Sequence, residues 1–284
     1  MHPAPTRRHF IKFSLALAAT LSPNAWSQQT AAQHSPKAGE KKGYAIGTGD
    51  PQWARMITDL NAKWFYNWGS KRPLGVPEGV DWVPMIHHDS ASNPATGALA
   101  QIHAEKEHKP TAVLGFNEPD QKSQGDMTVE QALELWPKLE ELNLPLGSPS
   151  GVHADCEWMQ SFMKQAAKRK YRVDFVTIHW YGDPNAAQFM GHLDRVAKLY
   201  KMPLWITEFC PGDWNALKTG KNKHTQKDVM RFIKDTLPRL ERVSYLHRYA
   251  WFCATPKDAA LSCSALFDAD GSINPLGKAY AEEG

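Results

Sequence analysis

Cysteine, net charge and long apolar runs are all scarce in this sequence of 284 residues. The four cysteines include no pair of CxxC motifs, which argues against a structural zinc site. The formal net charge is only +3, and the basic residues are scattered, so a nucleic-acid partner is not expected. The apolar run FSLALAATL is far shorter than the ~18 residues that cross a bilayer, so we expect no membrane anchor.

The few cysteines leave the question of disulfides open. They are Cys156, Cys210, Cys253 and Cys263, an even number that would suit an oxidising compartment. We favour a bond from Cys253 to Cys210 or to Cys263, because the predicted strands bring these positions together. Free buried thiols are an equally good alternative.

The first 27 residues have the features of an export signal. The segment TRRHFIK at residues 6–12 precedes the apolar run, and Ala25 and Ser27 offer small side chains to a signal peptidase. This arrangement resembles a twin-arginine signal, which implies export of a folded protein to the periplasm or the exterior. Residues 28–42 are polar and are expected to form a disordered leader, so residues 43–284 form the predicted domain.

Short apolar segments alternate with amphipathic stretches along the rest of the chain, which predicts repeated βα units and a parallel sheet. Eight such segments begin near residues 43, 64, 81, 112, 144, 173, 203 and 244. Eight strands are the number that closes a (β/α)8 barrel, the TIM-barrel fold, and the body is close to the ~250 residues typical of it.

The intervening stretches mostly predict helices, as at 128–143, 155–170 and 224–242. The stretch GSKRPLGVPEGV at 69–80 contains two prolines and three glycines, so no full helix is expected after the second strand. No linker divides the body, and a single domain is predicted.

Two glutamates lie at the ends of predicted strands. Glu118 ends the fourth segment (LGFNEPD), and Glu208 ends the seventh (PLWITEFC). All strands of a parallel barrel deliver their carboxyl ends to one face, so these side chains should meet across one cleft. A pair of carboxylates, one protonated and one ionised, is what hydrolysis of a glycosidic bond requires. If Glu118 stood alone, a capping or ion-paired glutamate at a turn would be the simpler interpretation. Its pairing with Glu208 at a matching strand end favours a catalytic role.

The motifs NEP at 117–119 and TEF at 207–209 resemble the retaining (β/α)8 glycosidases of clan A. Together with VDFVTIHWYG and RYAWF, they are similar to the small catalytic-core barrels of glycoside hydrolase family 128 over roughly residues 43–280. That resemblance implies that Glu118 is the acid/base and Glu208 the nucleophile, acting on β-1,3-glucan. No cofactor and no metal is then required.

The same resemblance assigns roles to other residues. It implies that Asn117 holds the 2-hydroxyl of the sugar, Tyr181 donates a hydrogen bond to Glu208, and Trp251 offers an apolar face to a pyranose ring. His179 shares its strand face with Tyr181 at a period of two residues, so it should lie one layer deeper and brace this network. A buried structural tyrosine and an ordinary core histidine are the alternatives.

Tryptophan is frequent, with 11 residues in the chain. Trp68, Trp180, Trp214 and Trp251 lie at strand ends or in the loop after the seventh strand, where stacking on sugar rings is expected. Asn67, beside Trp68, is a weaker candidate for substrate binding.

Three further polar residues need an interpretation. His87 and His88 follow the third segment at an unexpected place; adjacent residues of a strand point to opposite faces, so a shared metal ion is not expected. Asp120 is expected to cap a helix.

The sequence therefore predicts an exported, monomeric endo-β-1,3-glucanase that acts with retention. Cleavage of another β-linkage, transglycosylation, or a carbohydrate-binding barrel without turnover are the alternatives.

Overall fold

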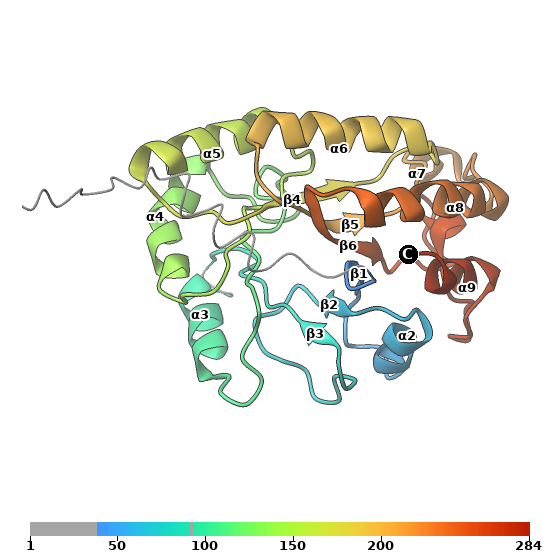
Figure 1. The fold of residues 1–284 in the computed structure, drawn as a ribbon, viewed down its shortest axis with the longest axis horizontal. Helices are drawn as coiled ribbons and strands as arrows, with labels where there is room; N and C mark the ends of the chain where they lie inside the picture. Colours follow the sequence, from blue (N-terminus) through green and yellow to red (C-terminus); the bar gives the residue numbers. More distant parts are fainter. Residues whose placement is uncertain (1–38, 91, 93) are drawn as a thin grey trace, which may run out of the picture.

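The structure, a computed structural model, describes residues 39–284 except 91 and 93. The predicted signal and most of the leader lie outside the described residues. The chain forms a ring of parallel strands surrounded by helices (Figure 1). None of the helices formed by the described residues combines the length and apolar character needed to cross a membrane.

Six regular strands form one parallel sheet in the order β3-β2-β1-β6-β5-β4. Their bounds are β1 Lys42–Ala45, β2 Trp64–Tyr66, β3 Asp81–Trp82, β4 Val176–Trp180, β5 Leu204–Phe209 and β6 Leu246–Phe252. They account for six of the eight predicted segments, namely the first three and the last three.

The two remaining segments close the ring between β3 and β4. Parallel bridges join Met85 to Leu114, Val113 to Leu146, and Gly147 to Phe175. Prolines at positions 84, 145 and 149 lack the N–H that a regular ladder needs, which explains why pairing here is reduced to single bridges. The predicted (β/α)8 barrel is confirmed.

A close approach of backbones is built into this irregular part. A Cβ atom on Gly115 would lie 2.9 Å from the carbonyl oxygens of Gly147 and Ser148. Only glycine fits such a contact, so this position sets how closely the fourth and fifth segments can pack.

Helices cover the outside of the ring. They are α2 Trp53–Asp59, α3 Ala95–Ala104, α4 Val129–Glu140, α5 Glu157–Arg169, α6 Ala186–Tyr200, α7 Ala216–Thr219, α8 Gln226–Arg242 and α9 Pro275–Glu282, with a 3-10 turn at Ser262–Ser264. Thr128 and Thr225 begin α4 and α8 with capping boxes, as the threonines in the sequence favour. Residues 67–80 contain no helix, which confirms the predicted gap after β2.

The folded body begins earlier than Gly43, so the predicted leader extends too far by at least two residues. Lys41 is 7% exposed, and Lys42 is 1% exposed and begins β1. Both amino groups donate to backbone carbonyls, those of Lys41 at the end of α8 and those of Lys42 near the end of the chain, which explains why these lysines can be buried.

The interior of the barrel is apolar below the mouth. Phe175 stacks on Trp205 with ring centroids 4.0 Å apart, and Trp64 packs against Trp205 at 5.5 Å. The guanidinium of Arg248 lies 4.5 Å from the Trp205 ring and pairs with Asp81 at 2.7 Å. This packed layer forms the floor on which the polar groups at the carboxyl ends of the strands rest.

Candidate active site

The fourth segment ends in a tight turn that presents Glu118. The φ angle of Glu118 is +40°, a left-handed conformation that costs a non-glycine residue on the order of 1–3 kcal/mol. Its N–H donates to Ser150 O at 2.7 Å, and its carbonyl accepts from Gln121 and Gly125. A Cβ on Gly125 would lie 2.4 Å from Asn117 O, so the loop packs directly under the NEP turn. The strained residue is held from both sides, which is typical of functional sites.

Glu208 is surrounded by hydrogen-bond donors. Its Oε1 accepts from Tyr66 OH at 2.6 Å and from Trp68 Nε1 at 2.8 Å, and its Oε2 accepts from Tyr181 OH. The side chain is only 6% exposed, whereas that of Glu118 is 15% exposed. The carboxylate is therefore fixed in one orientation as an acceptor, while Glu118 stays within reach of solvent.

His179 lies between the two glutamates. Its Nδ1 is 3.0 Å from Glu118 Oε1, and its Nε2 is 3.5 Å from Glu208 Oε1. One oxygen of each glutamate and a ring nitrogen of His179 all lie within 4.8 Å of one another. The structure thus brings together the residues at the ends of the fourth, sixth and seventh predicted strands.

The pKa values of the groups near Glu208 determine which of them can donate hydrogen bonds. Burial, followed by the charge of Glu208, raises the pKa of Tyr66 and of Tyr181 well above the ordinary value. Both phenols therefore remain donors over the whole ordinary pH range. Burial and the neighbouring His88 lower the pKa of His87, so this imidazole is neutral near pH 7.

Asn117 lies beside Glu118 and is 4% exposed. Its Oδ1 is buried and has no hydrogen-bond partner among the described residues. Its backbone N–H donates to His87 O at 2.8 Å, which ties the fourth segment to the third. A buried acceptor without a partner beside two carboxylates is a group that a bound hydroxyl would satisfy.

The structure does not bring Trp251 into the site. It is 0% exposed, donates from Nε1 to Ser264 O at 3.0 Å, and packs against Phe209 and Tyr280 between the sheet and the helices. The prediction of a sugar platform is wrong here, because Ala250 and Phe252 face the interior and Trp251 therefore faces outward.

Trp180 and Asn67 have partners other than the glutamates. Trp180 stacks on Phe232 of α8 at 5.5 Å, because its neighbours His179 and Tyr181 take the inward direction. Asn67 accepts from Trp82 Nε1 at 3.1 Å and contacts Thr48, so its amide joins two loops. Neither residue has a hydrogen bond to the carboxylates among the described residues, and their binding to substrate stays a prediction.

Two inward residues were missed from the sequence. Tyr66 donates to Glu208, and Phe252 packs edge-on against Tyr181 at 5.4 Å and against Trp68 at 5.8 Å. The sequence contained a signal for Tyr66, because Trp64, Tyr66 and Trp68 lie at alternate positions of the second segment. Period-two spacing places all three on the inner face once any one of them is placed there.

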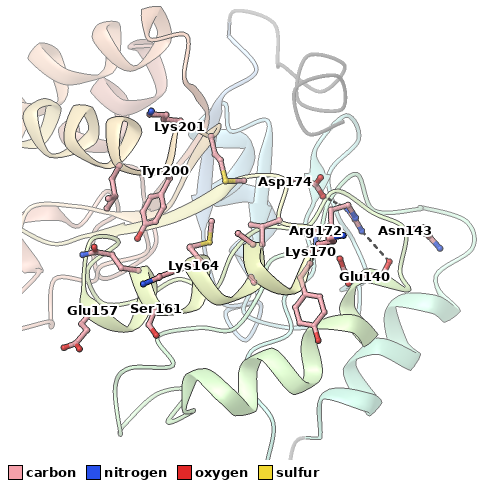
Figure 2. A pocket seen from close by; sticks show the side chains of 18 residues that line it. Glu140, Asn143, Glu157, Ser161, Lys164, Lys170, Arg172, Asp174, Tyr200 and Lys201 are labelled. Atoms are coloured by element: carbon pink, nitrogen blue, oxygen red, sulfur yellow. Dashed lines mark hydrogen bonds and ion pairs between the residues drawn. The ribbon is translucent and has the colours of Figure 1, made fainter. Parts of the chain in front are cut away.

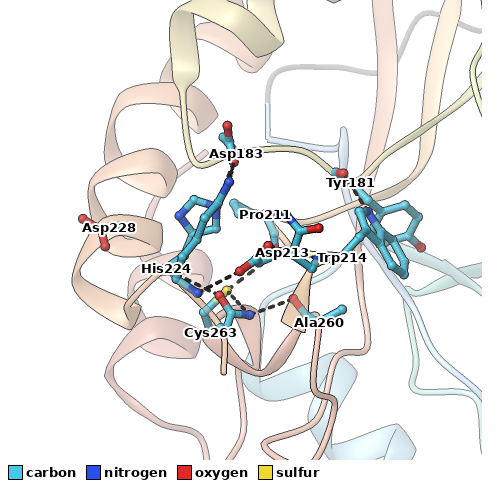
Figure 3. Close-up of polar contacts among 12 residues, drawn as sticks. Tyr181, Asp183, Pro211, Asp213, Trp214, His224, Asp228, Ala260 and Cys263 are labelled. Carbon is cyan, nitrogen blue, oxygen red and sulfur yellow. Dashed lines mark hydrogen bonds and ion pairs between the residues drawn. The ribbon is translucent and has the colours of Figure 1, made fainter. Parts of the chain in front are cut away.

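Trp68 and Trp214 lie at the mouth, in different roles. Trp68 binds Glu208 through its indole N–H, so it orients the carboxylate. Trp214 is 51% exposed, donates from Nε1 to Tyr181 O at 3.2 Å, and stands edge-on to the Tyr181 ring (Figure 3). About half of Trp214 is thus exposed next to the tyrosine that contacts Glu208.

The loop that carries Trp214 is anchored by a buried carboxylate. Asp213 is 4% exposed and accepts from the backbone N–H groups of Asn215 and Lys223, while its own N–H donates to Ala260 O (Figure 3). Asp183 joins this region by pairing with His224 at 2.9 Å. The position of Trp214 is therefore set by a polar network and not by a free loop.

The histidine pair does not behave as a regular strand predicts. His87 Nδ1 and His88 Nδ1 are 2.7 Å apart, so the two rings contact each other instead of pointing to opposite faces. The chain has already left β3 at this point, and the alternation no longer holds. Asp120 accepts from Val152 N–H at 3.0 Å and links two loops. The prediction that it caps the following helix is wrong, because the N-cap of α4 is Thr128.

Glu118, His179 and Glu208 have a spacing that could hold a metal ion. The donors around Glu208 argue against it. Tyr66 and Trp68 both direct hydrogens at the oxygen that would bind the ion. A cation there would have to displace these bonds.

The four cysteines are free thiols in the structure, so the favoured disulfides are not formed. Burial raises the pKa of Cys210 well above the ordinary value and that of Cys253 to about 11. Both are unreactive in this form.

A large groove lies away from the glutamates. It runs between α5 and α6, has a volume of about 1490 Å³, and is bordered by Lys164, Lys170, Tyr200 and Lys201 (Figure 2). None of the residues that contact Glu118 or Glu208 lines it. The chemistry described above belongs to the barrel mouth.

Comparison with known proteins finds a matching family and similar solved structures. The glycosyl hydrolase catalytic core family matches residues 43–280. A family 128 (subgroup I) endo-β-1,3-glucanase from Amycolatopsis mediterranei, in complex with laminarihexaose, is 30% identical with a TM-score of 0.72, over 86% of this chain and 100% of the other.

Two further structures show the range of similar proteins. A curdlan-specific exo-β-1,3-glucanase of subgroup III from Blastomyces gilchristii is 25% identical, with a TM-score of 0.64, over 87% of this chain and 99% of the other. An oligosaccharide-binding protein of subgroup VII from Trichoderma gamsii is 23% identical, with a TM-score of 0.68, over 86% and 93% of the two chains, which shows the shared fold alone. No curated protein matches the sequence.

Proposed function

Because this chain belongs to the glycosyl hydrolase catalytic core family, and resembles family 128 structures over most of its length, we propose that it is a retaining endo-β-1,3-glucanase. The observation that carries the proposal is the pair of glutamates at the mouth. Their nearest oxygens lie within 4.8 Å, in keeping with the ~5 to 5.5 Å separation of retaining enzymes.

In the first step, Glu118 protonates the glycosidic oxygen while Glu208 attacks the anomeric carbon. The bond to the leaving sugar breaks, and a covalent glycosyl ester forms on Glu208. Tyr66, Trp68 and Tyr181 hold the attacking carboxylate in place before the reaction. Such fixed donors avoid reorganisation of the site as the bond forms.

In the second step, Glu118 acts as a base. Water enters on the face that the leaving sugar vacated, Glu118 takes its proton, and the oxygen attacks the anomeric carbon. The ester bond to Glu208 breaks, and the sugar leaves with its original configuration. The 15% exposure of the Glu118 side chain is consistent with this access of water.

The β-1,3 linkage and the endo mode are supported by the relatives and by the rim. The Amycolatopsis enzyme is an endo-β-1,3-glucanase crystallised with a laminari-oligosaccharide. In this chain Trp214 extends an aromatic surface outward from Tyr181, which would bind sugars of a chain that runs past the cleavage point. The buried Oδ1 of Asn117 would accept from a sugar hydroxyl.

The proposal is tested by incubating wild type and Glu208→Gln with laminarin, barley mixed-linkage glucan, carboxymethylcellulose and mannan. Wild type should release oligosaccharides from laminarin, with the β-anomer appearing first by NMR, and the variant should lose this activity by about a thousandfold or more. Circular dichroism checks that the variant is folded. Products from mannan or cellulose instead of laminarin would overturn the linkage, and glucose alone would overturn the endo mode.

A carbohydrate-binding barrel without turnover is the second candidate. The Trichoderma protein, which is described as oligosaccharide-binding, has the same fold and is the reason to test this alternative. Laminarihexaose that stays intact while bound to the wild-type protein would favour it over the enzyme.

A further inference from the structure

The imidazole of His179 is confined between two carboxylates. Its Nδ1 lies 3.0 Å from Glu118 Oε1 and its Nε2 lies 3.5 Å from Glu208 Oε1. The side chain is 0% exposed, and Nε2 has no hydrogen-bond partner in the part of the chain that the structure describes. The position of the ring protons is therefore decided by the two glutamates.

One of the three possible protonation states conflicts with this geometry. A neutral ring with its proton on Nδ1 would leave the Nε2 lone pair 3.5 Å from an oxygen of Glu208, where the two repel each other. Two states avoid the repulsion. In the first, Nε2 carries the proton and Nδ1 accepts from a protonated Glu118; in the second, the ring is an imidazolium between two carboxylates.

These two states contain the same number of protons. They differ only in whether one proton lies nearer to Glu118 Oε1 or nearer to Nδ1, along a line of 3.0 Å. Groups coupled in this way lose their proton as a pair and not as separate residues.

We propose that the proton which Glu118 donates to the glycosidic oxygen is shared with His179 in the resting enzyme. The inference rests on the proposed function, since it concerns the acid of the first step. His179 acts as a positioning residue. The proton passes to the leaving oxygen as the glycosidic bond breaks and Glu208 bonds to the anomeric carbon, and His179 is left neutral with its proton on Nε2.

The same arrangement assists the second step. After the proton has left, the Nδ1 lone pair faces the ionised Glu118 at close range. That repulsion makes Glu118 a better acceptor for the proton of the incoming water, which is what the base must do. When water has given its proton to Glu118, the pair returns to its starting state.

The negative charges around the ring favour a state in which this proton stays bound to the pair. The charges of Glu208, Glu118 and Asp120 act on His179 and favour its protonated form, and the neutral His87 lies on the third segment. Burial lowers the pKa of His179, but the three carboxylates outweigh it, so the pKa is raised. Tyr66 and Tyr181, which contact Glu208, keep their protons.

The first test compares pH profiles of kcat/KM for wild type and His179→Gln, with His192→Gln as a control at a buried histidine of α6. The glutamine side chain cannot store a proton, so the alkaline limb should move to lower pH by about one unit or more. The control should leave the limb in place. The loss of rate should be large on laminarin and small on a dinitrophenyl laminaribioside, whose leaving group needs no proton. An unmoved limb with equal losses on both substrates would make His179 merely structural.

The second test needs no turnover, so it separates this inference from the proposed function. Nitrogen-15 NMR of wild type below the alkaline limb, or near pH 6 if turnover is absent, should place the Nδ1 resonance of His179 between its protonated and unprotonated limits. In Glu118→Gln the resonance should move to the unprotonated limit. A wild-type resonance already at that limit would overturn proton sharing. Failure to hydrolyse laminarin, with the NMR result as expected, would overturn the function alone.

Discussion

At Glu208, the donors arrive from the ends of two strands that are far apart in the sequence. Tyr66 is the last residue of β2, Trp68 lies two residues beyond it, and Tyr181 directly follows β4. Each donor contacts a defined oxygen, so the carboxylate has one orientation. Positioning of this kind is worth more in a buried site than on the surface, because little water competes for the oxygens.

Removal of one donor tests this positioning. In Tyr66→Phe, Glu208 keeps Trp68 and Tyr181 but loses a hydrogen bond to a charged group, worth about 1.5–3 kcal/mol. We expect kcat on laminarin to fall by about tenfold to a hundredfold, with the fold retained. Tyr44→Phe is the control, because it removes a buried phenol of β1 that packs in a different core cluster from Tyr66. Equal activity of both variants would show that Tyr66 does not hold the nucleophile.

On the scale of the strand, parity decides which aromatic residues reach the site. In β6, Trp251 packs outward against Tyr280, while its neighbour Phe252 packs inward against Trp68 and Tyr181. Adjacent side chains of similar size thus serve the core and the mouth respectively.

Two alanine variants separate these roles. Trp251→Ala should lower the free energy of unfolding by about 3–5 kcal/mol, because a fully buried ring leaves a cavity. Phe252→Ala, at a half-buried position, should lose less stability and more kcat/KM. Urea unfolding and laminarin kinetics measure the two effects. The reverse ranking in both assays would place Trp251 at the substrate.

The loop after β5 supplies a second test at this scale. Trp214→Ala should raise KM for laminarin by about tenfold, since stacking on a sugar ring is lost, while kcat changes little. Leu217→Ala is the matched control, because Leu217 is 65% exposed in α7, three residues after Trp214, and has no aromatic ring to stack on a sugar. A similar KM in both variants would remove Trp214 from the binding surface.

On the scale of the whole molecule, the two ends of the folded body are joined beneath the barrel. The amino group of Lys42, at the start of β1, donates to the carbonyls of Ala281 at 2.8 Å and Glu283 at 2.9 Å. These carbonyls end α9, where the helix dipole favours a positive charge. Burial nevertheless lowers the pKa of Lys42 from 10.5 to about 8.

This lowered pKa predicts a dependence of stability on pH. Between pH 8 and 10.5 the folded state has lost the Lys42 proton while the unfolded chain still holds it. The unfolded state then binds more protons, so the contribution of Lys42 to stability rises with pH in this window. The unfolding free energy of wild type minus that of Lys42→Met should increase over the window in urea titrations. Lys234→Met, at an exposed position of α8, should show no such trend, and a decrease for Lys42 would contradict the assignment.

The barrel and its two glutamates could be predicted from the order of residues alone. Eight apolar segments separated by amphipathic stretches specify the ring, and an acid that directly follows a strand must lie at the carboxyl end whatever the details of packing. Glu118 and Glu208 were found for that reason, and the gap after β2 followed from its prolines and glycines.

The face that each side chain takes could not be predicted in this way, because it depends on how the barrel closes. A strand buried on both sides reads as continuously apolar, so nothing local distinguishes Trp251 from Phe252, or Trp180 from Tyr181. The register of the ring sets that choice, through contacts between residues far apart in the chain. Tyr66 on Glu208 and His179 between the two glutamates are results of the same closure.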